Sequence, residues 1–352
     1  MRTAPVALAY LDDPAGLVEA AMALSALTHA DPEAGEACAL WCLAIRYAVV
    51  HGTFDGLYDG LDHLVPERRD VWVQRLREAE SREPSSFTHN GWVVEALQGA
   101  WSAITRTQIA PDGSVPGFGA DHLRRALEAA VRGGRDTDTV AAIAGALLGA
   151  RWGASAVPSQ WRRRLHGWPG LRARELVRLG VMSARHGQPD PQGWPSGKNM
   201  GYTSWPNCDA VARHPHDDHV WLSGVSLLAE PPDHIDAVVS LCRLGVDDVP
   251  APAVRTGDHV EVWLVDDARA DANPNLDFVL HDAAGAIAAL RAEGKTVLLH
   301  CVQAQSRTPT VAALYGASVT GRTGRECLSD IQVLLPNAHP NPAMLDALDR
   351  LS

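Results

Sequence analysis

The sequence predicts a chain of two parts, an all-α part followed by an α/β part with a mostly parallel central sheet flanked by helices. Three observations lead to this fold class. The chain has 352 residues, too many for one ordinary compact core. Its first half carries helical apolar spacing throughout, and its second half alternates short β-prone runs with helical stretches. We therefore expect a helical domain over 1–185, a linker rich in Gly and Pro over 186–204, and an α/β domain over 205–352.

Composition limits the classes of function. Hydrophobic residues make up 46% and charged residues 21%, which is typical of a globular protein. The net charge of −11 argues against a general nucleic-acid or anionic-membrane partner. Six cysteines in a chain of this length do not make a disulfide framework, and no segment is apolar enough to span a bilayer. We expect a soluble cytoplasmic protein.

The helical half is read from apolar residues spaced three and four apart. The best-defined helix begins at Asp31 and Pro32, a cap followed by a first-turn residue. No strand is expected in this half. The stretches predicted as helices are 14–29, 31–52, 88–107, 121–134 and 138–153.

The second half changes pattern. The runs 219–225, 259–267 and 296–300 are short and rich in β-branched residues, which predicts strands. The stretches 231–245, 275–294 and 308–319 have helical spacing. Strands that alternate with helices favour a largely parallel sheet.

One strand-to-helix junction combines a thiol and a guanidinium. The strand 296–300 ends at His300 and Cys301, and Arg307, Thr308 and Pro309 open the next helix. Backbone N–H groups converge at such a helix N-terminus and form an anion site. A thiol beside that site and beside Arg307 is favoured as a thiolate, and the planar guanidinium suits two phosphate oxygens. These are the parts needed for phosphoryl transfer through a cysteinyl-phosphate.

The segment "HCVQAQSRT" resembles the His-Cys-x5-Arg-Ser/Thr signature of the cysteine-dependent protein phosphatases, particularly the dual-specificity type. The resemblance covers roughly residues 205–340. It implies that Cys301 is the nucleophile, Arg307 the phosphate clamp and Thr308 a donor that helps the thiolate leave, with His300 orienting the loop and favouring ionisation of the thiol. No cofactor is implied. The implied phosphate-binding loop consists of Val302, Gln303, Ala304, Gln305 and Ser306.

The same family needs a general acid on a loop after an upstream strand. Asp266 and Asp267 come directly after the apolar residues of the run 259–267, and Asp271 is a third choice. We favour Asp266 or Asp267, and the sequence leaves the choice between them open. Ala304 stands where the family usually has glycine, a residue that allows the turn with little steric cost.

Other clusters of reactive residues have simpler explanations. Cys38 and Cys42 lie one helical turn apart in an apolar face, which is more typical of a core than of a metal site. The segment "RHPHDDHVW" (214–219 at its polar centre) has no tetrahedral metal spacing, and we interpret it as a solvated turn before a strand.

An acidic motif opens the helix 138–153. Asp136, Asp138 and Thr139 provide two carboxylates and a hydroxyl, which can ligate Mg²⁺, although such residues also cap helices commonly. Together, "PVALAYLDDPAGLVEAAMALSALTHADPEAGEACALWCLAIRYAV" and "GGRDTDTVAAIAGALLGARWG" resemble the ADP-ribosylglycohydrolase family over most of residues 4–170. The resemblance implies a two-magnesium centre in which Asp136, Asp138 and Thr139 are ligands, and a histidine at the ligand pocket, His29.

The family's other metal ligands belong to a motif upstream of the region that matches, and Asp12 and Asp13 do not replace them. We expect either a degenerate remnant or a start assigned at an internal methionine.

The sequence therefore predicts hydrolysis of a phosphomonoester, on a phosphorylated protein or a small molecule, through Cys301. Two alternatives stay open. One is Mg²⁺-dependent release of ADP-ribose from a modified protein, and the other is a module that binds ADP-ribose or phosphate without turnover. No nucleic acid or membrane partner is expected.

Overall fold

The computed structural model describes residues 2–110 and 117–352. It divides the chain into two compact units, and each unit takes two stretches of sequence. The first unit contains residues up to Val157 together with Leu179–Gln188, and the second contains Pro158–Arg178 and Pro189–Ser352. Within the described residues, none of the helices has the length and apolar character needed to cross a bilayer.

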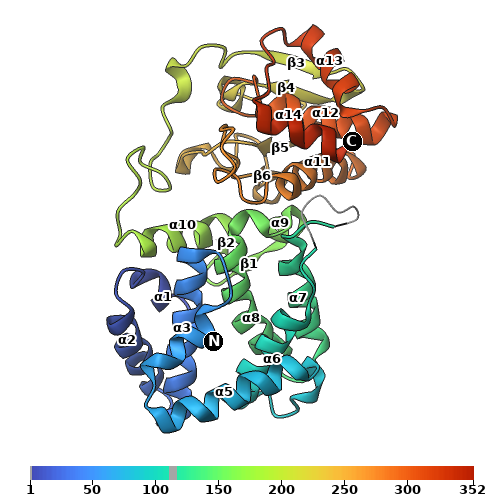
Figure 1. The fold of residues 1–352 in the computed structure, drawn as a ribbon. Coiled ribbons are helices and arrows are strands. Elements are labelled where there is room, and N and C mark those ends of the chain that lie inside the picture. The colour runs from blue at the N-terminus through green and yellow to red at the C-terminus, as the bar shows by residue number, and fades with distance from the viewer. Residues whose placement is uncertain (1, 111–116) are drawn as a thin grey trace. The chain divides into compact units, whose positions relative to one another are not determined.

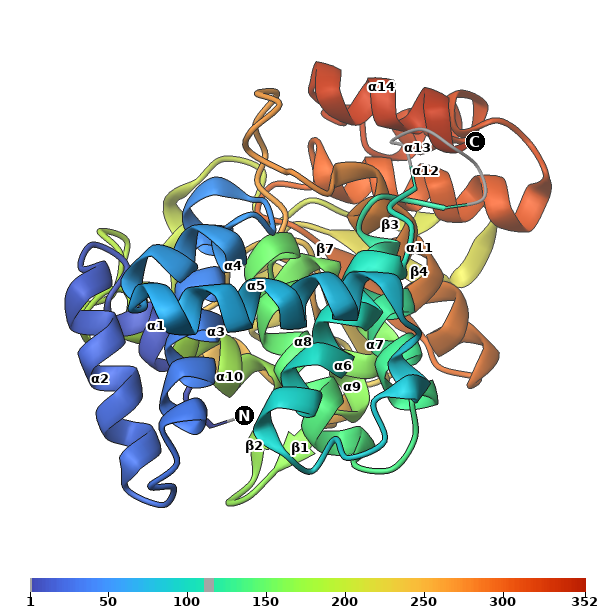
Figure 2. The ribbon, with the colours of Figure 1, turned by 60° about the horizontal axis from the view of Figure 1, so that its bottom comes forward.

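The first unit is a bundle of helices (Figure 1). α3, α6 and α8 pack against one another in its interior, and α2 packs against α3. Figure 2 shows the same helices from a second direction. As predicted, α3 begins after Asp31, whose side chain accepts a hydrogen bond from the Glu33 N–H. The helices are α1 (Val6–Ala9), α2 (Pro14–Ala26), α3 (Pro32–His51), α4 (Gly56–Asp59), α5 (Pro66–Ser81), α6 (Val93–Arg106), α7 (Asp121–Arg132) and α8 (Thr137–Trp152).

The second unit is built on a five-stranded sheet in the order β3-β4-β7-β5-β6. All neighbouring pairs are parallel except β3 and β4, so the predicted α/β class with a mostly parallel sheet is confirmed. α11 and α12 pack on the strands, and α13 and α14 pack on α12. The strands and helices that build this sheet are β3 (Val211–His214), β4 (Asp217–Ser223), β5 (Ala237–Ser240), β6 (His259–Glu261), β7 (Val297–His300), α11 (Leu276–Ala292), α12 (Arg307–Thr320), α13 (Gly324–Leu334) and α14 (Pro342–Leu351).

The prediction of a helix over 231–245 is wrong. The segment contains β5, and all four of its residues, Ala237–Ser240, are buried between β7 and β6. A strand covered on both faces has no polar alternation, so its apolar residues imitate helical spacing.

The expectation of no strand before residue 185 is also wrong. β1 (His166–Gly167) and β2 (Leu171–Arg172) form a short antiparallel pair. They lie between α9 (Ser159–Arg164) and α10 (Ala173–Ala184). Two-residue strands carry no readable period.

The carboxyl ends of the parallel strands define one edge of the sheet. His300 ends β7 and lies in register with Ser223 of β4 on one side and Ser240 of β5 on the other. Ligands of open α/β sheets bind outside this edge. The predicted thiol loop follows β7 there, and the predicted acid loop follows β6.

Candidate active site

The loop after β7 is held by its carbonyl groups. Val302 O accepts the Val225 N–H at 3.0 Å, and Gln305 O accepts the His339 N–H at 2.6 Å. The Gln303 side chain donates to Pro206 O at 2.9 Å. In the part of the chain that the structure describes, no acceptor is found for the backbone N–H groups of residues 302–306. This arrangement leaves the loop N–H groups without an acceptor, which an anion-binding loop requires.

Ala304 adopts the left-handed conformation, with φ of +54°. This region destabilises an L-residue by roughly 1–2 kcal/mol compared with glycine. The position therefore has the backbone geometry for which glycine is preferred, and the alanine methyl is buried against the surrounding loop.

Cys301 and the histidine before it are both buried. Their environment includes a chain of hydrogen bonds that we call the imidazole relay, formed by His259, Ser240 and His300. Ser240 Oγ lies 2.8 Å from His259 Nε2 and 2.6 Å from His300 Nε2. The Ala251 N–H donates to His259 Nδ1 at 3.0 Å, and His300 Nδ1 lies 3.2 Å from Cys301 O.

The direction of the relay follows from its ends. Because His259 Nδ1 accepts a hydrogen bond from a backbone N–H, its Nε2 carries the ring hydrogen and donates to Ser240. Ser240 then donates to His300 Nε2, and His300 Nδ1–H donates to the Cys301 carbonyl. Burial lowers the pKa of His259 to about 3 and that of His300 to about 4. Both rings are therefore neutral near pH 7, and His300 acts on the loop through hydrogen bonds rather than through charge.

Arg307 is fixed on one side of its guanidinium. Its Nη1 donates to Leu241 O at 2.8 Å and to Leu264 O at 3.0 Å. Leu241 directly follows β5, and Leu264 stands shortly before the predicted acids. Its buried Nε has no hydrogen-bond acceptor among the described residues. An edge consisting of Nε and Nη2 is the part of an arginine that binds two oxygens of one phosphate.

Thr308 has an orphaned hydroxyl. Its Oγ1 is buried and makes no hydrogen bond within the described residues. A buried unpaired hydroxyl is costly and calls for an explanation. A charge that exists only during a reaction would supply the missing partner.

The three aspartates predicted as candidates for the general acid have different surroundings in the structure. Asp266 Oδ2 lies 3.6 Å from Arg307 Nε, whereas Asp267 pairs with Arg269 at 3.1 Å. The backbone N–H of Arg269 lowers the pKa of Asp267, so this carboxyl group stays ionised and is less often protonated than an ordinary aspartate. Asp271 is largely exposed and lies 3.9 Å from Arg269. Asp266 is therefore the carboxylate that the fold brings to the loop.

Asn341 joins the acid to the loop and was not among the predicted site residues. Its side-chain Nδ2 donates to Asp266 Oδ1 at 2.9 Å, and its backbone N–H donates to Ser306 Oγ at 3.2 Å. Its Oδ1 also caps α14. The only signal in the sequence is Asn341 followed by Pro342, which marks a helix start and says nothing about the acid.

The acidic motif of the first unit lies at the start of α8, with Asp136 as the N-cap residue. Asn90 fixes this turn, because its Oδ1 accepts the Asp136 N–H at 3.2 Å and its Nδ2 donates to Gly134 O at 3.0 Å. His29 is exposed and lies 2.7 Å from Thr28 Oγ1, and no described hydrogen bond or ion pair links it to the motif that also contains Asp138 and Thr139.

A complete metal centre is not formed by these groups. Across residues 2–110 and 117–352, no three His, Cys, Asp or Glu side chains gather in a way that could hold a metal ion. Two carboxylates and one hydroxyl on a single helix end do not match the two-magnesium centre that the resemblance implies.

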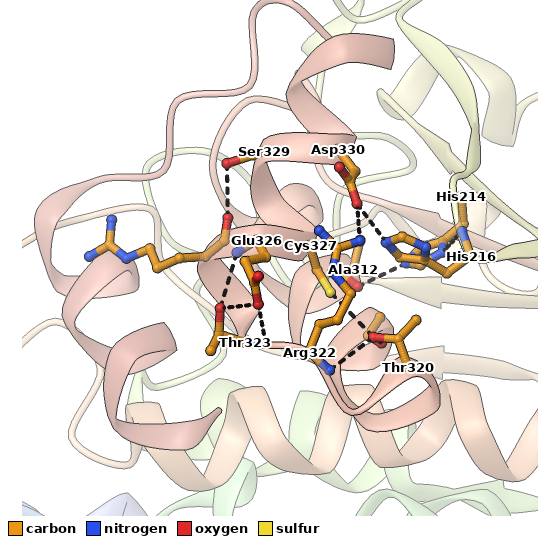
Figure 3. Close-up of polar contacts among 12 residues, drawn as sticks. His214, His216, Ala312, Thr320, Arg322, Thr323, Glu326, Cys327, Ser329 and Asp330 are labelled. Carbon is orange, nitrogen blue, oxygen red and sulfur yellow. Dashed lines mark hydrogen bonds and ion pairs between the residues drawn. The ribbon is translucent and has the colours of Figure 1, made fainter.

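The histidine-rich segment before β4 is a hairpin and not a solvated turn. His214 is buried in β3, donates to Ala312 O at 2.9 Å and accepts the His216 N–H at 3.1 Å (Figure 3). His216 Nε2 lies 3.1 Å from Asp330 Oδ2. Both rings thus have structural partners, on α12 and on α13.

Comparison with known proteins finds a family match for the first part of the chain and solved structures similar to about 40% of it. The family model for ADP-ribosylglycohydrolase matches residues 1–190. The ADP-ribosyl-[dinitrogen reductase] glycohydrolase of Rhodospirillum rubrum is 26% identical over 165 residues, which are 47% of this chain and 49% of that protein. The ADP-ribosylarginine hydrolase Tri1 of Serratia proteamaculans is 24% identical over 141 residues, 40% of this chain and 34% of that protein. The chain thus spans half or less of the length of these curated relatives.

Solved structures similar to this chain are dual-specificity and tyrosine phosphatases. Human DUSP28 has a TM-score of 0.34 and 18% identity, with 41% of this chain and 95% of that chain covered. Tk-PTP in its active form has a TM-score of 0.32 and 23% identity, with 42% of this chain and 97% of that chain covered.

Proposed function

The chain belongs to the ADP-ribosylglycohydrolase family through residues 1–190, but the described residues of this part do not complete a metal centre. We therefore propose that the catalytic activity lies in the other part, as hydrolysis of a phosphomonoester by Cys301. The observation that carries the proposal is the loop between β7 and α12. This loop contains Cys301 and a row of N–H groups without described acceptors, and it leads to Arg307, whose Nε makes no described hydrogen bond and lies 3.6 Å from Asp266 Oδ2.

The first step forms a cysteinyl-phosphate. The Cys301 thiolate attacks phosphorus while the phosphate oxygens accept hydrogen bonds from the loop N–H groups and from Arg307. The bond between phosphorus and the leaving oxygen breaks, and protonated Asp266 gives its proton to that oxygen. Asn341 positions Asp266 for this transfer through the hydrogen bond from its Nδ2.

The second step returns the enzyme to its starting state. A water molecule attacks phosphorus and loses a proton to the Asp266 carboxylate, the S–P bond breaks, and inorganic phosphate leaves. The Thr308 hydroxyl, which lacks a described partner, donates to the departing thiolate. Its isolation in the structure is consistent with a partner that becomes charged only in this step.

The test is the hydrolysis of p-nitrophenyl phosphate by the full chain. We expect vanadate-sensitive turnover that falls to background in Cys301→Ser. Cys327→Ser is the matched control, because this buried cysteine lies on α13 and contacts only Thr320 Oγ1 among described polar groups, at 3.7 Å. Equal turnover in the wild type and in Cys301→Ser contradicts the proposal. Phosphate binding without turnover would favour the non-catalytic alternative.

The family match also favours a second candidate, the release of ADP-ribose from a modified target. Asp136 and Asp138 are the residues of this chain that would take part, held by Asn90. Because the described residues do not complete a metal centre, we derive no step through magnesium. ADP-ribose release from ADP-ribosylated arginine that requires Mg²⁺ and is lost in Asp138→Asn would establish this activity. If the full chain releases no ADP-ribose in this assay, no catalytic activity is assigned to the first unit.

A further inference from the structure

A cavity of about 310 Å³ lies in the second unit, away from the Cys301 loop. Part of its wall comes from the segment 158–178, and the rest comes from β6 and the residues on either side of it. None of the residues of the 301–307 loop contributes to the wall. A volume of this size is at the lower end of those that hold small organic ligands.

Arginines dominate the polar part of the wall. Four arginines line the cavity against two glutamates, Glu175 and Glu261, an excess of two positive charges. The arginines are Arg162, Arg163, Arg172 and Arg174.

Three of these arginines are fixed by hydrogen bonds or ion pairs with neighbouring residues. Arg163 donates to Gly257 O at 2.8 Å and pairs with Asp258 at 3.1 Å. Arg162 pairs with Asp282 at 3.4 Å, and Arg174 pairs with Glu261 at 3.2 Å. Preorganised guanidinium groups lose little freedom when they bind an oxyanion.

Arg172 differs from the other three arginines because its guanidinium has no described partner. Its backbone N–H donates to Glu175 Oε2 at 2.8 Å, but no acceptor is found for its half-buried guanidinium among the described residues. A cation that lines a cavity and has no carboxylate partner is suited to an anion from outside the chain.

The remaining wall is apolar and aromatic. Val249, Pro250 and Val260 line it, and Trp263 lies under Arg162 with 5.1 Å between the guanidinium carbon and the ring centroid. This surface can hold a ring or a sugar. A bare phosphate would leave most of the volume unfilled.

We propose that this arginine-lined cavity binds an organic phosphate, a phosphate or diphosphate ester that carries a sugar or a planar ring. The phosphate oxygens bind Arg172 and the preorganised guanidinium groups beside it, and the organic part packs on Pro250 and Trp263. The cavity shares His259 with the imidazole relay, but none of the residues 301–307 lines it, so its anion-binding arginines are distinct from Arg307.

The test is calorimetric titration of the full chain with ADP as the probe and adenosine as its phosphate-free counterpart. We expect ADP to bind, adenosine not to bind, and ADP affinity to fall with added salt. Arg172→Ala should weaken ADP binding about tenfold or more. Arg178→Ala is the matched control, because Arg178 is exposed on α10, one turn beyond Arg174, and does not line this cavity, so this variant should keep wild-type affinity.

Arg307→Lys tells the two anion sites apart. ADP binding that survives Arg307→Lys and is weakened by Arg172→Ala supports the proposal. Binding that is lost in Arg307→Lys and unchanged in Arg172→Ala places the anion at the Cys301 loop and overturns it, as does a wild-type chain that does not bind ADP. If Arg172→Ala does not fold, crystals of the wild type soaked in ADP decide: density in the cavity supports the proposal, and density only elsewhere overturns it.

Discussion

Two serines on either side of His300 provide a direct test of the imidazole relay. Ser240 and Ser223 both lie opposite His300 in the sheet, one on β5 and the other on β4, and both are fully buried. Ser240 Oγ bonds to His259 Nε2 and His300 Nε2, whereas Ser223 Oγ has no hydrogen-bond partner among the described residues. Replacement of either serine by alanine removes the same single oxygen atom.

The expected effects differ in size and sign. Ser240→Ala leaves one buried donor on His259 and one buried acceptor on His300, and each unmet group costs about 1–3 kcal/mol, so the loss of stability is about 2–6 kcal/mol. Ser223→Ala removes a hydroxyl that gains nothing from burial, so we expect a change within about 1 kcal/mol, or a slight stabilisation. Ser240→Ala should also lower phosphatase turnover, because His300 would lose the bond that orients it.

Hydrogen exchange is the suitable assay, since the chain has two units and need not unfold in one transition. The peptides that cover 237–241 and 296–302 report the local free energy of opening in β5 and β7. We expect their protection to fall in Ser240→Ala and to be kept in Ser223→Ala. Equal effects of the two substitutions, or a larger loss in Ser223→Ala, would refute the hydrogen-bonded relay through Ser240.

Three further outcomes follow from the site. Burial lowers the pKa of His259 to about 3 and that of His300 to about 4, whereas a histidine in the unfolded chain has a pKa near 6.5. Between these values the unfolded chain binds more protons than the folded chain, so the folded state loses stability as the pH falls. The hydrogen-exchange protection of β5 and β7 should therefore fall from about pH 6.5 towards pH 4 and stay level above pH 6.5. Asp266→Asn should lower turnover of alkyl phosphates by about 10²–10⁴, and less for p-nitrophenyl phosphate, whereas Asp267→Asn should not; a loss confined to Asp267→Asn would reassign the acid. Ala304→Gly relieves about 1 kcal/mol of backbone strain but loses a buried methyl and frees the unfolded chain by similar amounts. Hydrogen exchange of the peptides that cover the loop and α12 should therefore show a change in opening free energy below about 1 kcal/mol. The control Ala312→Gly, inside α12, should lose about 2 kcal/mol, and a comparable loss at Ala304 would mean that the methyl supports the loop.

The junction between β7 and α12 could be predicted because its signals are local. A short apolar run, a thiol, an arginine and Pro309 stand within a few residues of one another, and the structure begins α12 at Arg307. The left-handed backbone at Ala304 also matches the expectation that this position prefers glycine. Whether these residues catalyse a reaction stays a prediction.

The partners of the loop could not be predicted because they come from distant segments. Ser240 belongs to a segment predicted as a helix, and His259 to one predicted only as a strand. Asn341 carries the signal of a helix cap. Their roles depend on which strands become neighbours, and that order is decided by packing in three dimensions rather than by local spacing. The same packing separates Asp266 from Asp267, which the sequence left equivalent.

The segment 158–178 shows why the family boundary and the structural boundary differ. The family match continues to residue 190, but this segment belongs to the second unit. β6 is the last strand in the sheet order, and Arg162 donates to Glu261 O on it while Ser159 donates to Asp282 on α11 at 3.0 Å. The segment thus covers a sheet edge that would otherwise present unpaired backbone groups. Division of the chain at residue 190 or 205 would expose that edge and leave Glu261, whose side chain is 9% exposed, without Arg174. The α/β unit therefore includes sequence that lies within the match to the ADP-ribosylglycohydrolase family model.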